Sequence, residues 1–505
     1  MGHDFVIVGG GSAGATLAAR LSEEPGRSVL LLEAGASGPL NTPDDRIANV
    51  SFASTPRDWG MRAHITAERE VEYPQGRFVG GGSSVNGALA FRATPSDFDG
   101  WAAAGNPSWS FEQMLPCLRR LEDDRDFGDD AQVHGRGGPV PIVRWGEDEL
   151  VPLQEAFRAG CEATGSKWCD DFNRPGTTGV GPLPMNRDGD VRVSTALAYL
   201  APALDRPNLE VRGDAHVARV CIDGGRANGV EVVTASGTER LEAGTVVVSA
   251  GSILSPGLLW RSGVGPGDAL RALGITPLVD NAAVGANLMD HPGTFVFARP
   301  SGELGPTDPQ YQLAVRATSA TGTADDLFVS MMNVFDLAAM PDLRNALGTP
   351  TAVVLTCGVH EPRSRGSVTL ESADPSAPPR IELNLLADPA DAARLVEGIR
   401  RCREIAHAGM SKFVGSIALL DDDDFADDAG LEAYARSVVA PWYHASGTCR
   451  MGPAGSADAV VGDDLAVHGV DHLYVADASV MPVITRAPTN ITTIAIAERA
   501  ADLFG

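Results

Sequence analysis

The sequence lacks several patterns that would assign it to a particular class of protein. Its seven cysteines are odd in number, scattered and never spaced as CxxC, so neither a disulfide framework nor a zinc site is indicated, and a reducing compartment fits. Basic residues are few, because 40 Lys and Arg stand against 66 Asp and Glu and leave a net charge of −26. This charge argues against nucleic acid or an anionic membrane surface as a partner.

Long apolar runs are also missing. No window approaches the length of a membrane-spanning helix, so we expect no membrane span. A predicted strand begins within five residues of Met1, which leaves no room for a secretory leader, and we expect a cytoplasmic protein. The acidic run Asp421–Asp424, with Asp427 and Asp428, could suggest a cation site. Because a helical pattern follows it, a solvated loop with a helix cap fits better, and we expect no metal.

At 505 residues the chain exceeds the usual size of one hydrophobic core, so we expect two structural domains. No internal repeat or long low-complexity linker separates them, which suggests that they are interleaved along the chain. In the second half, residues 324–335, 351–360 and 366–371 read as strands. Residues 390–407 carry apolar side chains at the spacing of a helix face.

The amino terminus carries the most informative motif. An apolar run at residues 5–8 reads as a strand and is followed at once by Gly9-Gly10-Gly11-Ser12-Ala13-Gly14. The first glycines allow a tight turn and close approach to a pyrophosphate, and Gly14 lets the following helix lie close to the strand. A second apolar run, residues 28–32, ends at Glu33, whose carboxylate can bind an adenosine ribose. This spacing predicts a dinucleotide-binding βαβ unit.

Later segments predict that the chain returns to the same sheet. Residues 245–249 form an apolar strand that ends in small residues, which places Ala250 near the cofactor. Residues 473–476 read as a strand ending at Asp477, and residues 491–504 read as a helix. Asn490, just before that helix, could be its N-cap. The small residues 80–84 suit a loop that meets a pyrophosphate closely, the alternative being a flexible surface loop.

Further blocks follow along nearly the whole chain. They are Asp58-Trp59, residues 76–86, residues 97–101, residues 251–259 and 262–265, residues 287–291, residues 364–366, residues 443–452 and residues 475–479. In this order the blocks resemble the glucose-methanol-choline (GMC) oxidoreductases, which are FAD-dependent alcohol oxidases and dehydrogenases. The resemblance implies an α/β fold: a doubly wound FAD/NAD(P)-binding (Rossmann-like) domain with an interleaved α+β substrate-binding domain built on an antiparallel sheet. We expect the FAD-binding domain at residues 1–140, 195–295 and 464–505, and the substrate-binding domain at 141–194 and 296–463.

The resemblance also implies the cofactor and the residues that bind it. Some members of the family attach the flavin to a histidine just before the asparagine of the glycine-rich block. Here that position is Val85, so we expect FAD to be bound non-covalently. The expected cofactor-binding residues are Gly9, Gly11, Ser12, Ala13, Gly14, Glu33, Ala34, Gly81, Ser83, Asn86, Gly87, Ala88, Val217, Ala250, Asp477, Ala478, Asn490 and Ile491.

His444 matches the catalytic histidine of the family, and Asn490 falls on the partner position, which is usually His or Asn. Oxidation of an alcohol needs a base for the hydroxyl proton, a role that a neutral His444 suits, while Asn490 would hold the oxygen as charge develops. The N-terminus of the last helix would favour negative charge on the reduced flavin. We read His291 as a structural residue at a turn. The aromatic residues Trp59, Trp442 and Tyr443 either line the substrate pocket or belong to the core.

The reaction implied is oxidation of a small-molecule alcohol to an aldehyde or ketone, with O2 or another electron acceptor. The segment around His444, with a downstream Asn, is similar to members that act on hydroxymethyl groups of aromatic or heteroaromatic rings. Three alternatives stay open: a dehydrogenase with a quinone or protein acceptor, a non-redox lyase, and a flavin-carrying interaction protein without turnover. We expect the side chains that select the substrate in residues 40–70 and 300–360.

Overall fold

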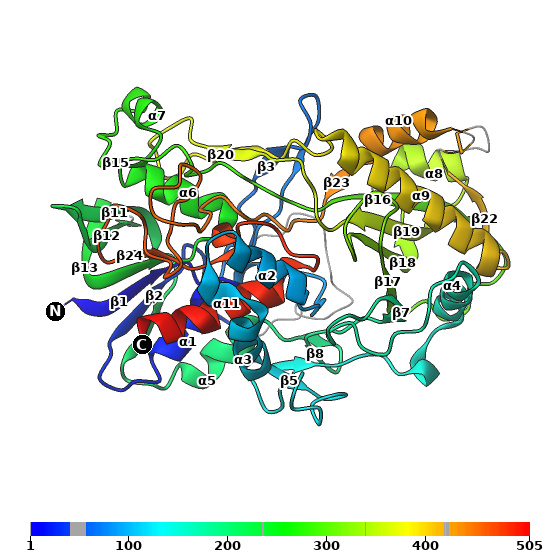
Figure 1. Ribbon diagram of the computed structural model, residues 1–505, viewed down its shortest axis with the longest axis horizontal. Coiled ribbons are helices and arrows are strands. Elements are labelled where there is room, and N and C mark those ends of the chain that lie inside the picture. Colours follow the sequence, from blue (N-terminus) through cyan, green and yellow to red (C-terminus); the bar gives the residue numbers. More distant parts are fainter. Residues whose placement is uncertain are drawn as a thin grey trace.

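A computed structural model describes residues 2–40, 57–234, 237–338, 340–418, 420, 424–425 and 427–505. Its two largest sheets have seven strands each. Figure 1 shows one sheet on the left, around β1 (His3–Val8) and β13 (Gly237–Val248). The other lies on the right, around β16 (Pro292–Pro300) and β19 (Thr351–Val359), and both ends of the chain lie on the left.

The first sheet contains the apolar segments that the sequence predicts as parallel strands. β1 pairs in parallel with β2 (Val29–Leu32) on one side and with β13 on the other. β24 (Leu473–Val475) lies parallel to β13, and β10 (Leu209–Arg212) lies parallel to β2. All four residues of β2 are buried, as expected for a strand covered on both faces. The predicted strands at residues 5–8, 28–32, 245–249 and 473–476 are confirmed.

The same sheet has an antiparallel edge. β13 is long enough to pair with β1 at its end and with β12 (Arg226–Thr234) along its beginning, and β12 pairs with β11 (His216–Asp223). These three strands therefore extend the parallel sheet by a hairpin-linked meander. Val217, near the start of β11, lines the same cavity as Leu32 and Glu33 at the carboxyl end of β2.

Two helices from opposite ends of the chain pack against each other beside this sheet. α1 (Ser12–Leu21) begins in the glycine-rich turn after β1, and α11 (Thr489–Phe504) closes the chain. α11 begins earlier than predicted, because Pro488 is its N-cap and the proline ring fixes the backbone that leads into the helix. The interpretation of Asn490 as an N-cap is therefore wrong. Asn490 lies in the first turn of α11.

The second sheet is antiparallel, in the order β22-β16-β19-β18-β17-β7, with β23 beside β16. The long helix α9 (Pro389–Gly409) packs against β19 and against α4 (Pro152–Ala163). The helix predicted over 390–407 and the strands predicted over 324–335, 351–360 and 366–371 are confirmed. The other strands of this region are β7 (Gly179–Pro182), β17 (Leu313–Ala317), β18 (Leu327–Asp336), β20 (Ser367–Thr369), β22 (Val414–Ile417) and β23 (Ala440–Pro441). The residue ranges expected for the two domains stay predictions.

The remaining elements are short and connect or cover these sheets. The strands are β3 (Arg62–His64), β4 (Glu70–Glu72), β5 (Glu122–Asp124), β6 (Val140–Ile142), β8 (Arg187–Asp188), β9 (Val191–Arg192), β14 (Val264–Gly265), β15 (Val279–Asp280) and β21 (Arg380–Glu382). The helices are α2 (Pro95–Ala103), α3 (Phe111–Leu121), α5 (Ala201–Ala203), α6 (Gly251–Arg261), α7 (Gly267–Ala272), α8 (Pro341–Leu347) and α10 (Asp428–Val438). Helical turns of other types are η3 (Gly81–Ser84), η4 (Pro107–Trp109), η5 (Glu147–Glu149), η6 (Ala196–Leu200) and η7 (Ala478–Val480).

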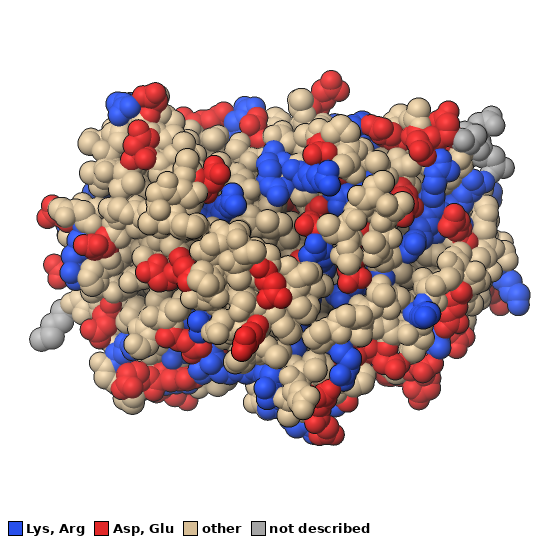
Figure 2. Space-filling model, in the orientation of Figure 1, with Lys and Arg blue, Asp and Glu red and all other residues tan. Residues whose placement is uncertain are grey.

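Three expectations drawn from composition concern the surface charge, a membrane span and the acidic run at residues 421–428. Figure 2 shows acidic and basic side chains interspersed over one face of the molecule. In the part of the chain that the structure describes, no helix is long and apolar enough to cross a membrane. The side chain of Asp427 accepts the backbone N–H of Gly430, so the helix cap predicted for the acidic run is confirmed. Asp421, Asp422 and Asp423 lie outside the described residues.

Candidate active site

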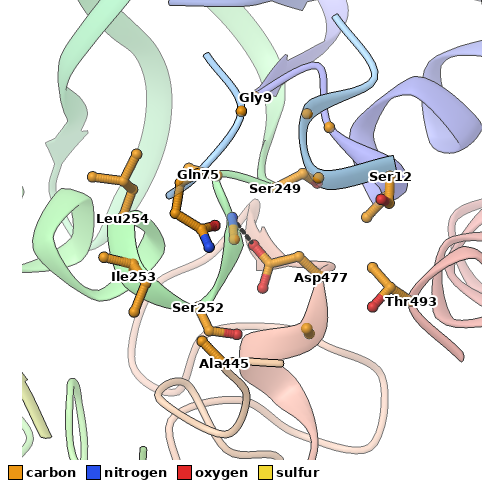
Figure 3. A pocket seen from close by; sticks show the side chains of 18 of the residues that line it. Gly9, Ser12, Gln75, Ser249, Ser252, Ile253, Leu254, Ala445, Asp477 and Thr493 are labelled. Atoms are coloured by element: carbon orange, nitrogen blue, oxygen red, sulfur yellow. Dashed lines mark hydrogen bonds between the residues drawn. The ribbon is translucent and has the colours of Figure 1, made fainter. Parts of the chain in front are cut away.

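A cavity of about 270 Å³ lies at the carboxyl ends of β1, β2, β13 and β24. This edge of a parallel sheet is where α/β proteins bind nucleotides, because loops and helix N-termini converge there. Figure 3 shows Gly9, Ser12, Ser249 and Asp477 around the cavity, together with Ser252 from the start of α6. The segments 75–89, 443–445 and 488–493 also contribute to its walls.

The turn between β1 and α1 requires glycine for more than one reason. Gly9 has a φ of +102°, a conformation that other residues rarely adopt. A Cβ on Gly14 would lie 1.9 Å from the carbonyl oxygen of Gly9, so this glycine lets α1 pack against the strand. Gly81 approaches from the other side, since a Cβ on it would lie 2.8 Å from the Cα of Gly11. The loop at residues 80–84 is therefore packed against the turn rather than free on the surface.

Glu33 lies at the carboxyl end of β2 and lines the cavity. Its carboxylate accepts the backbone N–H of Gly10 at 2.9 Å and that of Gly35 at 2.8 Å. Burial raises the pKa of Glu33, and these backbone donors oppose the shift. Each carboxylate oxygen has a further lone pair, so Glu33 can fix the glycine-rich turn and still accept from ribose hydroxyls.

Asp477 links the end of β24 to the segment that follows the neighbouring strand β13. Its Oδ2 accepts the backbone N–H of Gly251 at 2.9 Å and the hydroxyl of Ser255 at 2.6 Å, and its Oδ1 accepts the backbone N–H of Ser479 at 2.8 Å. Burial raises the pKa of Asp477, and the hydrogen bonds oppose that shift. Asp477 thus orders the N-terminus of α6 at the cavity.

His444 reaches the cavity from the loop after β23. Its ring Nδ1 lies 2.8 Å from Nδ1 of His291, and its backbone N–H donates to Oδ1 of Asp290 at 2.9 Å. Burial, with a smaller contribution from His291, lowers the pKa of His444 well below the usual histidine value. His444 is therefore neutral at neutral pH and available as a base.

The neighbours of His444 come from the segment Asp290-His291 and from the loop before α11. Nε2 of His291 lies 2.9 Å from the carbonyl oxygen of Thr485. The hydroxyl of Tyr73 donates to Oδ2 of Asp290 at 2.5 Å. Burial raises the pKa of Asp290 to about 7. The sequence interpretation of His291 as a turn residue missed its contact with His444, because the two residues lie 153 positions apart.

Asn490 lines the same cavity as His444. Its Oδ1 accepts the hydroxyl of Ser12, in the glycine-rich turn, at 2.8 Å. Its Nδ2 is buried and has no hydrogen-bond partner among the described residues. A buried donor without a partner is costly, so this amide is suited to a ligand that accepts its hydrogen.

Known proteins that match the chain identify its family. Residues 3–293 and 362–497 match two family models, both described as GMC oxidoreductase. The chain belongs to the GMC oxidoreductases. It is 36% identical over 533 residues to a 5-(hydroxymethyl)furfural oxidase of Methylovorus sp. (strain MP688), with 99% of this chain and 98% of the relative covered. It is 33% identical over 545 residues to a glucose dehydrogenase (FAD, quinone) of Drosophila pseudoobscura pseudoobscura, with 99% and 86% covered.

A solved structure of pyridoxine 4-oxidase from Mesorbium loti is similar throughout, with a TM-score of 0.90 and 31% identity over 99% of this chain and 98% of that one. The resemblance drawn from the sequence motifs is confirmed. The protein is an FAD-dependent GMC oxidoreductase that acts on CH–OH donors.

The structure of this GMC oxidoreductase brings most of the predicted site residues to one cavity. The predicted residues that line it are Gly9, Gly11, Ser12, Ala13, Glu33, Ala34, Gly81, Asn86, Gly87, Val217, Ala250, His444, Asp477, Ala478 and Asn490. Gly14, Ser83, Ala88 and Ile491 do not line it. Ser83 instead donates to the carbonyl oxygen of Gly80 at 2.6 Å, so it orders the loop from within.

Several lining residues were not predicted. Gln75 precedes the glycine-rich block at residues 76–86 and Gly76 begins it, while Ser252 and Leu254 lie in the first turn of α6, and Arg261 lies in its last turn. A signal for Ser252 was present, because a helix that follows a buried parallel strand directs its first turn at the nucleotide site. Part of the region expected to select the substrate, residues 41–56, lies outside the described residues.

The cavity fits FAD by the chemistry of its walls. The glycine-rich turn and the N-termini of α1 and α6 supply backbone N–H groups for phosphates. Two buried polar atoms on lining residues, Nδ2 of Asn490 and Oγ of Ser252, have no partner among the described residues. A cofactor with many acceptor atoms satisfies such groups.

Proposed function

We propose that this enzyme oxidises a hydroxymethyl group on an aromatic or heteroaromatic ring to the aldehyde, with His444 as the general base. The single observation that carries the proposal is that a neutral histidine lines the same cavity as the dinucleotide-binding turn. The substrate class is supported by two similar proteins, a 5-(hydroxymethyl)furfural oxidase and a pyridoxine 4-oxidase, because pyridoxine is a pyridine ring that carries hydroxymethyl groups.

The chemistry divides between the cofactor and the chain. When bound, FAD accepts the hydride that leaves the carbinol carbon. His444 takes the hydroxyl proton as the carbon–oxygen double bond forms, so the alkoxide never has to exist free. The pKa of His444 is low because of burial, which keeps the imidazole unprotonated before the substrate arrives.

Asn490 has two expected roles, to hold the substrate oxygen and to bind FAD. Its contact with Ser12, in the nucleotide-binding turn, favours the second role, and we propose that its Nδ2 donates to FAD. The carboxylate of Asp477 acts indirectly, by ordering the backbone N–H group of Gly251 at the start of α6, whereas that of Glu33 orders the glycine-rich turn and also accepts from ribose hydroxyls.

FAD is proposed to be bound non-covalently, because Val85 has no nucleophilic side chain. A cytoplasmic location is proposed from the seven cysteines, which are all buried and free. The electron acceptor is O2 or another acceptor such as a quinone. The names of the relatives include both an oxidase and a quinone dehydrogenase, so the acceptor has to be measured.

The test is an anaerobic titration of the purified holoenzyme. 5-(Hydroxymethyl)furfural, pyridoxine, benzyl alcohol, glucose and choline are each added while the flavin absorbance is followed. We expect the ring-borne hydroxymethyl compounds to bleach the flavin fastest, and bleaching by glucose or choline alone would overturn the substrate class. If no alcohol bleaches it, the redox function fails and a lyase becomes the better hypothesis. Admitting air and measuring peroxide then separates an oxidase from a dehydrogenase.

A further inference from the structure

The contact between His291 and His444 determines where the hydrogen atoms of both rings lie. Their Nδ1 atoms are 2.8 Å apart, which is a hydrogen-bond distance. An imidazole nitrogen either carries a hydrogen and donates, or has a lone pair and accepts. One of the two rings must therefore donate from Nδ1, and the other must accept at Nδ1.

The other nitrogen of His291 decides which ring accepts. Nε2 of His291 lies 2.9 Å from the carbonyl oxygen of Thr485, and a carbonyl oxygen can only accept. Nε2 of His291 therefore carries a hydrogen. His291 is fully buried, and burial lowers its pKa to about 4, so the ring is neutral and its Nδ1 has no hydrogen.

It follows that His444 donates from Nδ1 and that its Nε2 has a free lone pair. We propose that His291 is a positioning residue that fixes His444 in this tautomer, so that Nε2 of His444 is the atom that takes the hydroxyl proton. This inference rests on the proposed function of His444 as the base. When Nε2 takes the proton, Nδ1 keeps its own hydrogen, and its bond to His291 becomes charge-assisted and stronger.

The arrangement differs from a catalytic triad in the group that orients the base. In a serine protease triad a carboxylate accepts from Nδ1 of the histidine. Here a neutral imidazole does so, and it is itself oriented by a backbone carbonyl. A neutral partner raises the basicity of His444 less than a carboxylate would, which agrees with the low pKa of His444.

Burial keeps His291 neutral, against backbone hydrogen bonds that raise its pKa, and the groups packed around the ring fix its position. The ring centroid of His360, just after β19, lies 4.7 Å from that of His291. Burial lowers the pKa of His360 well below the usual histidine value, so this neighbour is neutral too. Asp290 precedes His291 in the chain, and its carboxylate accepts from Tyr73 and from the backbone of His444. The hydrogen-bond partner of Nδ1 of His444 is therefore the imidazole of His291, whereas the carboxylate of Asp290 contacts the backbone of His444.

Two substitutions separate positioning from simple support. His291→Asn keeps an oxygen at the place of Nδ1, which can accept from His444, whereas His291→Gln keeps an amide at the place of Nε2, which can still donate to Thr485. We expect His291→Gln to slow flavin reduction by the best alcohol about 100-fold or more, and His291→Asn to slow it less than about tenfold. FAD content and the alcohol Kd should stay near wild type in both. Equal losses, or a larger loss in His291→Asn, would overturn the proposal.

A second readout does not depend on turnover. The holoenzyme labelled with 15N-histidine has ten histidines, and the signals of His444 are identified by their loss in His444→Ala. We expect a protonated Nδ1 and an unprotonated Nε2 for His444 in the wild type, and a mixture of tautomers in His291→Gln. A wild-type spectrum with hydrogen on Nε2 of His444 would refute the proposal even in an active enzyme. Failure of every alcohol to reduce the flavin refutes the proposed function instead and leaves this measurement valid.

Discussion

The hydroxyl of Tyr73 donates a buried 2.5 Å hydrogen bond to the carboxylate of Asp290, which also accepts the backbone N–H of His444. The pKa of Asp290 is raised to about 7 by burial, so ionising this group costs stability as the pH rises from 3.8, its usual value, to about 7. Tyr73→Phe removes a donor that favours the ionised form and raises this pKa further. We expect the variant to be less stable at pH 8 by about 1–2 kcal/mol, with a smaller difference at pH 5.

Urea unfolding of the holoenzyme at pH 5 and pH 8 measures that difference. Tyr434→Phe is a matched control, because the hydroxyl of Tyr434 donates to the carbonyl oxygen of Phe295, which does not titrate. Its loss should be the same at both pH values. A loss in Tyr73→Phe that is independent of pH would show that Asp290 does not titrate between pH 5 and pH 8.

His444 sets the acid limit of flavin reduction. Its pKa is lowered, so the neutral form persists as the pH falls below about 6.5, the ordinary histidine value. We expect the rate of flavin reduction to stay level from pH 8 to pH 6.5 and to decline only in stronger acid. His444→Ala should lower the rate about 100-fold or more and keep FAD bound. A decline centred at pH 6.5 or higher in stopped-flow traces would contradict a buried neutral base.

Asn490→Ala tests which ligand the free amide serves. Its Nδ2 has no partner among the described residues, and its Oδ1 is fixed by Ser12. If Nδ2 donates to FAD, the variant should bind FAD about tenfold more weakly, as expected for one lost hydrogen bond, with kcat near wild type once saturated. Ser12→Ala keeps the amide but frees its oxygen, and should show a smaller effect. A large fall in kcat with unchanged FAD affinity would instead assign Asn490 to the substrate oxygen.

The indole of Trp442 packs against two glycines that are paired on neighbouring strands of the second sheet. Gly293 on β16 pairs with Gly358 on β19, and a Cβ on Gly358 would lie 2.5 Å from the indole. We expect Gly358→Ala to destabilise the protein by about 1–3 kcal/mol through overpacking and to shift the tryptophan fluorescence. Because the Trp442 ring lies edge-on to His444, flavin reduction should slow as well.

Gly415→Ala is the control for that substitution, since Gly415 lies in strand β22 and its nearest atom to an added Cβ is 3.6 Å away. Its stability and fluorescence should stay close to wild type. Equal effects in the two variants would mean that the loss of glycine itself, rather than the contact with the indole, weakens the sheet.

His134 lies in a buried cluster of charges away from the cavity. Burial alone would lower its pKa, but hydrogen bonds to Asp124, Asp171 and Glu122 outweigh burial and raise it to about 10. A raised histidine pKa stabilises the fold fully below about 6.5, and this contribution is lost as the pH rises towards 10. His134→Ala should cost about 3–5 kcal/mol at pH 6, because it leaves three buried carboxylates to share two arginines. The deficit should shrink at pH 9.5.

The same cluster has ligand atoms of Glu122, Asp124 and His134 close enough to hold a metal ion. Both ring nitrogens of His134 contact carboxylates, and Arg92 and Arg144 pair with the same acids. A protonated histidine cannot bind a metal, so EDTA should leave the unfolding curve unchanged. A drop in stability on chelation would contradict the ion-pair interpretation and indicate a bound metal ion at this cluster.

The parallel strands and the glycine-rich turn could be predicted from the sequence because their signals are local. A buried strand such as β2 is an unbroken apolar run, Gly9 is required by its own positive φ, and Gly14 is required by its contact with the backbone of nearby Gly9. His444 has no such local signal, and it could be named only because its motif block resembles that of the GMC family. Helix α11 was misplaced at its start, because the proline before it, rather than the asparagine, forms the cap.

Contacts between distant segments could not be predicted in this way. The pairing of His291 with His444, and of Asn490 with Ser12, depends on how two sheets and the last helix come together. The spacing of apolar residues indicates local secondary structure, and it does not indicate which distant segments come into contact. The sequence could not name the side chains that select the substrate, because the segments in which we expect them, residues 40–70 and 300–360, carry no repeating pattern.

The bond between Ser12 and Asn490 joins residues 478 positions apart. The segment at residues 488–493 is therefore synthesised long after the glycine-rich turn, and the cavity wall that it forms is incomplete until that segment is in place. We expect a variant that lacks residues 482–505 to be produced as a colourless chain without bound flavin, because it has lost that wall.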